Sequence, residues 1–208
     1  MKRIAVFILI FGAINPSFAQ REKGQTVLTA NAGFSAYRIF ILAQIMSNEN
    51  DSALNIRSKT DPVAILGIDH FITKNFSFGG SVAYQKVTAN YDRLYGDSLT
   101  LFENIDASAA KLSLTLRGLF YYGKSEKKQF YSGLKLGYQK VKTFDNSSDN
   151  TYNTINDLAW SRVTIGLIPF GMRYFFTENI GCNFEVSLGV PNLLSFGLNY
   201  KIPGKKSF

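Results

Sequence analysis

The feature that most constrains this chain is an alternation of apolar residues with polar residues or glycine. Residues 194–202 are the clearest case, because every second residue there is apolar and every other one is polar or glycine. A β-strand places such alternating residues on its two opposite faces. The same period of two recurs, with varying regularity, in residues 25–37, 63–72, 76–86, 111–122, 130–142, 160–176 and 180–189. The sequence therefore predicts eight strands and an all-β fold.

The segment 160–176 changes parity along its length. Val163 and Leu167 belong to one apolar face, and Phe170 continues that face after a shift of one residue. Pro169 lies at the shift. A β-bulge would restore the register, and bulges are among the few places where a strand tolerates proline. We therefore expect a bulge at Pro169.

The connections between the expected strands differ in length. Short ones at 73–75, 123–129 and 177–179 alternate with longer ones at 38–61, 90–106 and 144–159, and the last, 190–193, is short again. Short turns at one end and mostly long loops at the other are typical of outer-membrane barrels. An even number of strands places both termini on the periplasmic side and the long loops outside. Within the first loop, the apolar stretch 39–46 is expected either to extend the first strand or to fold as a short helix against the rim.

Charged residues indicate which face of the strands is outside. The polar faces carry charge in mid-strand, at Arg117, Lys135 and Glu185. An Arg or Lys facing lipid at mid-depth costs roughly 2–4 kcal/mol, whereas charges in a lumen can pair with one another. We therefore predict an apolar exterior, with Glu185 paired to Lys135, Arg117 or both in the lumen. Side chains largely fill an eight-stranded barrel, which argues against a wide channel.

Aromatic residues gather at the strand ends that adjoin the short turns. They occur at residues 120–122, 130–131 and 174–176. Amphipathic rings at the membrane interface form girdles around transmembrane barrels. The sequence therefore predicts that these residues form a periplasmic aromatic girdle.

The N-terminus predicts export. A basic start is followed by an apolar run at 4–14 and by small residues at Ser17 and Ala19, so cleavage is expected before Gln20. The apolar run is well short of the roughly 20 residues of a membrane-spanning helix, although a short anchor is the alternative. The expected domains are a cleaved signal peptide at 1–19 and an outer-membrane β-barrel at 20–208.

The formal net charge of +8 comes from scattered basic residues. We expect no nucleic-acid partner for an exported chain of this kind. Contact with outer-membrane lipid and with the phosphates of lipopolysaccharide is the simpler use of this charge. The sequence names no extracellular ligand.

No constellation of catalytic or metal-binding residues stands out. The one histidine, His70, follows Asp69, but neighbouring strand residues face opposite sides, so Asp69 cannot orient the imidazole. The one cysteine, Cys182, has no partner for an internal disulfide and is expected to be a small apolar side chain. We therefore expect no enzyme activity, no cofactor and no metal site.

The C-terminal part of the chain resembles a known family. Residues 171–181, followed by residues 184–186, resemble the penultimate hairpin of the outer-membrane β-barrel proteins common in Bacteroidetes, and residues 195–202 resemble their closing strand. The closing strand is also similar to the signal read by the barrel-assembly machinery. The matching positions are Ser195, Gly197, Tyr200 and Ile202, of which Ile202 departs from the usual final aromatic residue.

The resemblance implies an eight-stranded antiparallel up-and-down transmembrane β-barrel, porin-like or OmpA-like, with the assembly machinery as a partner. It implies little about molecular activity. The expected function is that of a non-enzymatic integral outer-membrane protein with a structural or surface role, or with narrow porin-like permeation. A loop-mediated adhesin or surface receptor is one alternative, and a soluble lipocalin-like carrier is another.

Overall fold

The computed structural model describes residues 23–37, 52–95, 101–122, 125, 127–145, 161–189 and 191–204. Within them lie the strands β1 (Thr26–Phe34), β2 (Ser52–Thr60), β3 (Val63–Thr73), β4 (Phe76–Tyr95), β5 (Leu101–Tyr122), β6 (Lys128–Asp145), β7 (Ser161–Phe175), β8 (Ile180–Leu188) and β9 (Leu194–Ile202). The expected signal peptide and the stretch 39–46 lie outside the described residues. In the described part of the chain, no helix has both the length and the apolar character needed to cross a membrane.

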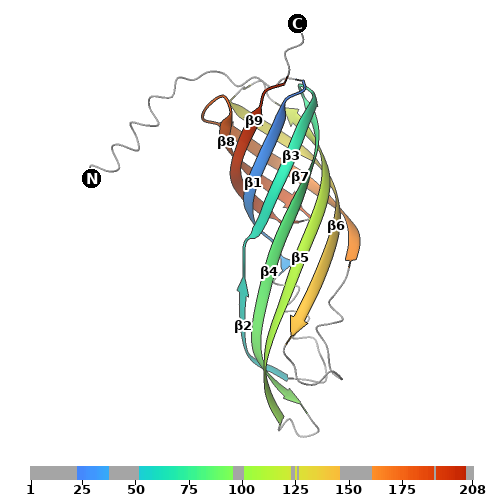
Figure 1. Cartoon of the computed structure of the whole chain (residues 1–208), viewed down its shortest axis with the longest axis vertical. Coiled ribbons are helices and arrows are strands. Elements are labelled where there is room, and N and C mark those ends of the chain that lie inside the picture. The colour runs from blue at the N-terminus through green and yellow to red at the C-terminus, as the bar shows by residue number, and fades with distance from the viewer. Residues whose placement is uncertain are drawn as a thin grey trace, which may run out of the picture.

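The strands close into a barrel. Neighbouring strands follow the order β2-β4-β3-β1-β9-β8-β7-β6-β5, and the pairing of β4 with β5 joins the two ends. Both β2 and β3 pair with β4, so they are two parts of one barrel strand, interrupted at Asp61 and Pro62. Proline has no N–H to donate to the ladder, which accounts for the break. The predicted eight-stranded antiparallel barrel is confirmed (Figure 1).

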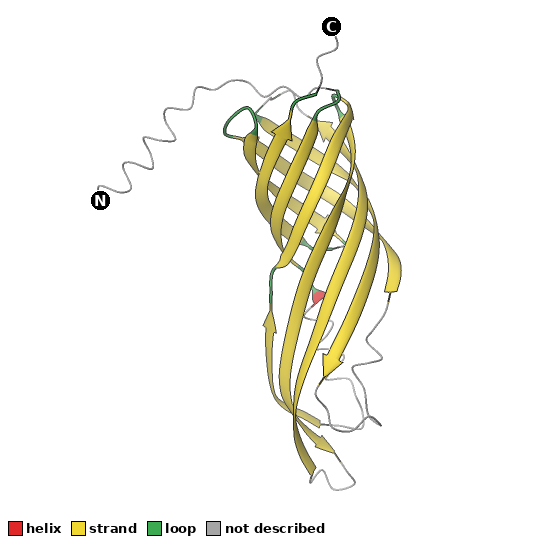
Figure 2. Cartoon of the chain, viewed as in Figure 1, coloured by secondary structure: helices red, strands yellow, loops and turns green. Residues whose placement is uncertain are grey.

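Strand length varies around the barrel. β1, β8 and β9 have nine residues each, whereas β4 has 20, β5 has 22 and β6 has 18. The long strands continue far beyond the short ones (Figures 1 and 2). We call the outer extension the part formed by β2, residues 86–95, residues 101–110 and residues 142–145. The expectation of loops is therefore wrong for residues 52–60 and for most of residues 90–106, whereas residues 38–51 and 146–159 lie outside the described residues.

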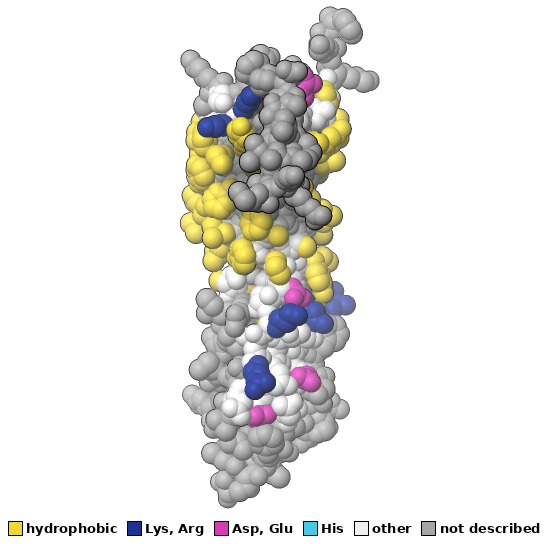
Figure 3. All heavy atoms as spheres, turned by 90° about the vertical axis from the view of Figure 1, so that its left-hand side faces the viewer, with side chains coloured by type: hydrophobic (Ala, Val, Ile, Leu, Met, Phe, Trp, Pro, Cys, Tyr) yellow, Lys and Arg dark blue, Asp and Glu magenta, His cyan; other side chains and the backbone are white. Residues whose placement is uncertain are grey.

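The exterior of the barrel carries an apolar belt. Leu116 is 53% exposed and Ile165 is 77% exposed, although both lie in mid-strand. Yellow side chains cover this part of the molecule in Figure 3, and polar side chains replace them toward the outer extension. On β4 the last apolar residue of the belt is Tyr84, and Lys86 follows it on the same face. The predicted apolar exterior is confirmed.

The polarity of the two faces is reversed in the outer extension. Along β4, the outward residues from Lys86 to Asp92 are polar, whereas the inward residues Val87, Ala89 and Tyr91 are apolar and buried. The prediction of loops is wrong here because it follows one continuous apolar face, and that face ends at Tyr84. The alternation itself continues, but here the outward residues are polar and the inward residues are apolar.

The predicted bulge in β7 is confirmed. Leu167 pairs with Leu188 and Phe170 with Val186, so β7 uses one residue more than β8 between these pairs. The bulge reverses the parity of everything after it. As a result Arg173 points into the barrel, where it is fully buried.

The predicted aromatic girdle is only partly correct. Phe120 and Tyr122 face outward and are exposed, but Tyr121, Tyr131 and Phe175 are buried inside the barrel. Neighbouring residues of a strand face opposite sides, so a run of three aromatic residues cannot lie entirely in a girdle.

Candidate functional site

The structure brings Arg117, Lys135 and Glu185 together in the lumen. Arg117 and Lys135 are direct cross-strand partners on β5 and β6, where two like charges would repel each other. Glu185 reaches both from β8. Its Oε1 lies 2.5 Å from Lys135 Nζ and its Oε2 lies 3.6 Å from Arg117 Nη1. The carboxylate thus compensates two cations that the strand register forces side by side.

A second carboxylate, Asp69 on β3, completes the site. Arg117 donates from Nε to Asp69 Oδ1 at 2.7 Å and from Nη2 to Oδ2 at 2.6 Å, a bidentate arrangement. Arg173 Nη2 donates to the same Oδ2. Asp69 and Arg173 are fully buried, and the structure therefore adds two charged residues that the sequence reasoning missed.

Two tyrosines line the same cluster. Arg173 Nη1 donates to the Tyr121 hydroxyl at 2.6 Å, and the Tyr131 hydroxyl donates to Glu185 Oε2 at 3.2 Å. The Arg173 guanidinium also lies 5.1 Å from the centroid of the Tyr131 ring, within cation–π range. We call these seven residues the lumen network. It consists of Asp69, Arg117, Tyr121, Tyr131, Lys135, Arg173 and Glu185.

Glycines make room for the network. Gly79 pairs with Asp69 across the β3–β4 ladder, and a Cβ there would lie 2.4 Å from Asp69 Oδ1. A Cβ on Gly171 would lie 2.2 Å from the Tyr131 ring. Both distances are far inside van der Waals contact, so these side chains fit only because the positions carry no Cβ.

The network contains three positive groups and two negative ones, which leaves one excess positive charge. Each of its charged side chains is at most 4% exposed. Removing one partner of such a buried pair typically costs about 3–5 kcal/mol, because the other charge is left unpaired. The arrangement fixes β3, β5, β6, β7 and β8 to one another across the lumen. Such an arrangement can brace the barrel wall from within and block the lumen.

The other predicted site residues lie elsewhere. Ser195, Gly197, Tyr200 and Ile202 belong to β9, which pairs with β1 and β8 to close the barrel, and they take no part in the lumen network. Ser195 is buried, whereas Tyr200 and Ile202 face outward. Recognition of this strand by the assembly machinery stays a prediction.

His70 lies outside the lumen network. Its Nδ1 is 3.0 Å from Thr26 Oγ1 and its side chain is exposed, whereas Asp69 is buried on the opposite face. The expected separation of His70 from Asp69 is confirmed. In the described residues, no group of three or more His, Cys, Asp and Glu side chains is placed to hold a metal ion.

Comparison with known proteins points to the fold alone. No protein-family model matches the sequence, and no curated protein matches it. The outer membrane protein OprG from Pseudomonas aeruginosa is similar in structure, with 12% identity, a TM-score of 0.50, and coverage of 89% of this chain and 99% of that chain. At this identity the likeness to OprG shows a shared fold and says nothing of activity.

Two further solved structures have lower TM-scores. The N-terminal β-barrel domain of OprF from Pseudomonas aeruginosa has 12% identity and a TM-score of 0.45, with coverage of 86% of this chain and 98% of that one. The attachment invasion locus protein Ail of Yersinia pestis has 16% identity and a TM-score of 0.43, with coverage of 86% and 99%.

Proposed function

We propose that this chain is a non-enzymatic integral protein of a Gram-negative outer membrane, with both termini in the periplasm and the outer extension outside the cell. The reversal of polarity between Tyr84 and Lys86 carries this proposal. A barrel in water gains no stability by exposing an apolar belt, whereas a barrel in a membrane requires one. The end of the belt then marks the edge of the hydrocarbon layer. The antiparallel closure also pairs the backbone groups that lipid would leave unsatisfied.

We further propose that the barrel is sealed at the level of the lumen network. Five charged side chains and two tyrosines meet there, and all seven are almost inaccessible to water. This supports a structural or surface role over porin-like permeation. The charged interior also argues against the soluble lipocalin-like carrier, which needs an apolar calyx.

The first test is migration of unboiled and boiled membrane fractions on a denaturing gel. A folded transmembrane barrel resists detergent and migrates differently until it is heated. We expect a heat-dependent shift in the outer-membrane fraction. A soluble protein without the shift would overturn the proposal and favour the carrier.

The sealed lumen is tested by conductance in planar bilayers. We expect no steady conductance from the native chain. The double variant Lys135→Ser/Glu185→Ser removes one positive and one negative charge, so the excess charge of the network is unchanged, and we expect it to conduct. An open native channel would replace the sealed barrel with a narrow pore.

A second candidate function is that of an adhesin or surface receptor, and the outer extension favours it. Strands β4 and β5 stay paired from Phe76–Phe120 to Tyr95–Leu101, and the described outward residues of β4 beyond the belt, from Lys86 to Asp92, are polar. Replacing residues 91–105 by a tight turn should leave the heat-dependent gel shift intact. Loss of cell attachment to host or abiotic surfaces in this variant would support the receptor, and unchanged attachment would count against it.

A further inference from the structure

Basic side chains border the apolar belt on its outer side. They are Arg57, Lys59, Lys86, Lys140 and Lys142, all exposed, and we call them the basic collar. Figure 3 shows basic side chains just beyond the yellow belt and farther along the outer extension. The collar thus lies where lipid tails would end and lipid headgroups would begin.

The strand register places the collar on the outward face. Lys86 pairs with Ala110, and Ala110 pairs with Lys142, so the two lysines flank a small side chain. Strands lie about 4.8 Å apart, which puts these two lysines roughly 10 Å apart at their backbones. Lys59 pairs with Thr88 in the next row outward. A phosphate group above Ala110 would be within reach of both flanking ammonium groups.

Carboxylates on the same face are held by amides. Asp92 accepts hydrogen bonds from Asn55 and from Asn104, each at 2.8 Å, and Asp106 accepts one from Asn90 at 2.7 Å. With Asp61 there are three carboxylates against the five cations of the collar, which leaves two excess positive charges. The charge of Arg57 also helps to lower the pKa of Asp92, so part of the collar's charge is compensated.

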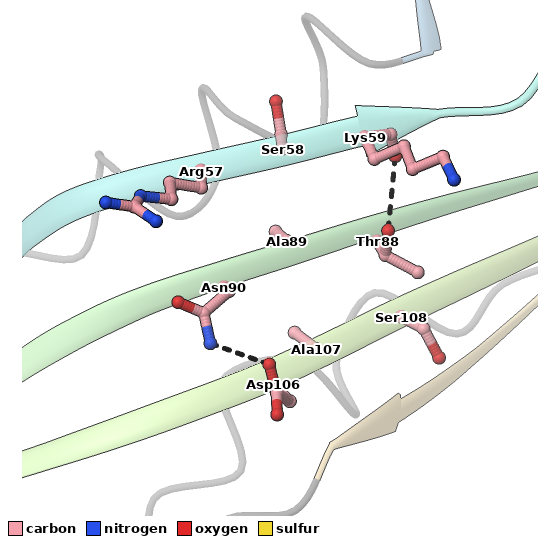
Figure 4. Close-up of a pocket in the computed structure, with 9 residues that line it drawn as sticks. All are labelled: Arg57, Ser58, Lys59, Thr88, Ala89, Asn90, Asp106, Ala107 and Ser108. Carbon is pink, nitrogen blue, oxygen red and sulfur yellow. Dashed lines mark hydrogen bonds between the residues drawn. The ribbon is translucent and has the colours of Figure 1, made fainter.

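Two hollows adjoin the collar. A polar hollow of about 450 Å³ lies among Arg57, Lys59, Thr88, Asn90, Asp106 and Ser108 (Figure 4). Its hydroxyl and amide groups are of the kind that bind sugar hydroxyls. An apolar hollow of about 400 Å³ lies in the belt among Leu114, Leu116, Leu136, Tyr138 and Val163. Tyr138 and Lys140 are successive outward residues of β6, so this hollow ends directly beneath the collar.

We propose that this wall binds a phosphorylated glycolipid of the outer leaflet. The collar binds the phosphates, the polar hollow receives the sugar, and the apolar hollow receives an acyl chain. The proposal rests on the proposed function, because the collar must face the outer leaflet. Charge complementarity and continuity with the belt favour a lipid over a soluble acidic protein, which would have no use for an apolar hollow beneath the cations.

The test measures binding of fluorescently labelled diphosphoryl lipid A to the full-length barrel in neutral detergent micelles. The collar variant is Lys86→Gln/Lys142→Gln. Its matched control is Lys74→Gln/Lys128→Gln, which removes the same charge from exposed lysines at the periplasmic ends of the strands. Each lysine near an anionic surface is worth about a factor of five in affinity, so we expect roughly tenfold or greater weakening for the collar variant and little change for the control.

A second arm uses chemically dephosphorylated lipid A, which should bind the native chain roughly tenfold less well. If both variants weakened lipid A binding equally, the effect would come from the overall charge of the chain, and the proposed site would be overturned. Equal binding of the two lipids would overturn it as well. Both variants must keep the heat-dependent gel shift. If the native chain lacked the shift, the proposed function itself would fail, which separates that outcome from failure of the binding site.

Discussion

The membrane half of the barrel and the outer extension are built from the same strands but follow opposite rules. On β5, Leu112, Leu114 and Leu116 face outward in the membrane half, and Arg117 faces inward. In the outer extension, Ser108 faces outward and the buried side chains are alanines. The backbone ladder runs through both halves without interruption. Strand formation therefore does not depend on the medium, whereas the polarity of each face does.

The largest expected effect comes from the lumen network. Asp69→Asn removes the charge that holds Arg117 and Arg173, and the free energy of unfolding should fall by about 3–5 kcal/mol. Asp92→Asn, on the exposed face of the outer extension, is the control. Urea unfolding in lipid vesicles measures both, and similar losses for the two variants would contradict the comparison.

A charge placed on the outward face should separate the two halves directly. Leu116→Arg puts a cation in the belt and should cost about 2–4 kcal/mol. Ser108→Arg also introduces an outward arginine on β5, but at a position beyond the belt. It should change the free energy of unfolding by less than about 0.5 kcal/mol. If Ser108→Arg is as costly as Leu116→Arg, the belt does not end at Tyr84.

A substitution on the inward face of the outer extension tests whether that face is apolar and dry. Ala89 is 4% exposed, so Ala89→Asn buries an amide and should cost about 1–3 kcal/mol if the amide stays unsatisfied. Thr88→Asn, one residue earlier on the outward face, should be nearly neutral. The same unfolding assay applies, and a neutral Ala89→Asn would show that the inner face of the outer extension is wet.

The smallest expected effect is the response of the outer extension to acid. Hydrogen bonds from Asn55 and Asn104 hold the pKa of Asp92 below its ordinary value. The carboxylate therefore stabilises this sheet fully above about pH 4, and the contribution is lost as the pH falls through the lowered pKa. Amide NMR signals of Asn55 and Asn104 should titrate together below pH 4. In Asp92→Asn they should not.

Much of the membrane half could be predicted from sequence. A period of two fixes the faces of each strand, which is why Arg117, Lys135 and Glu185 could be placed in the lumen. The parity shift at Pro169 also places Arg173 on the inward face, a consequence that the sequence prediction does not include. Asp69 is harder to predict from sequence, because it lies in an almost wholly apolar segment.

The remaining features depend on tertiary geometry. Which lumen side chains meet is set by the tilt of the strands and by the glycines that admit Asp69 and Tyr131, and neither follows from local alternation. The outer extension was missed for a different reason. Val87, Ala89 and Tyr91 do alternate with polar residues, but on the face opposite to the one that is apolar in the membrane half.

The uninterrupted pairing of β4 with β5 has a mechanical consequence. From Lys86 to Tyr95 the ladder rises about 30 Å along the strand direction beyond the belt. A force that pulls the tip of this hairpin away from the cell pulls both strands in the same direction, so the load falls in shear on the ladders that join β4 to β3 and β5 to β6. The hairpin should therefore be mechanically stiff. Anything attached at its tip would pull on a barrel wall that the lumen network braces from within.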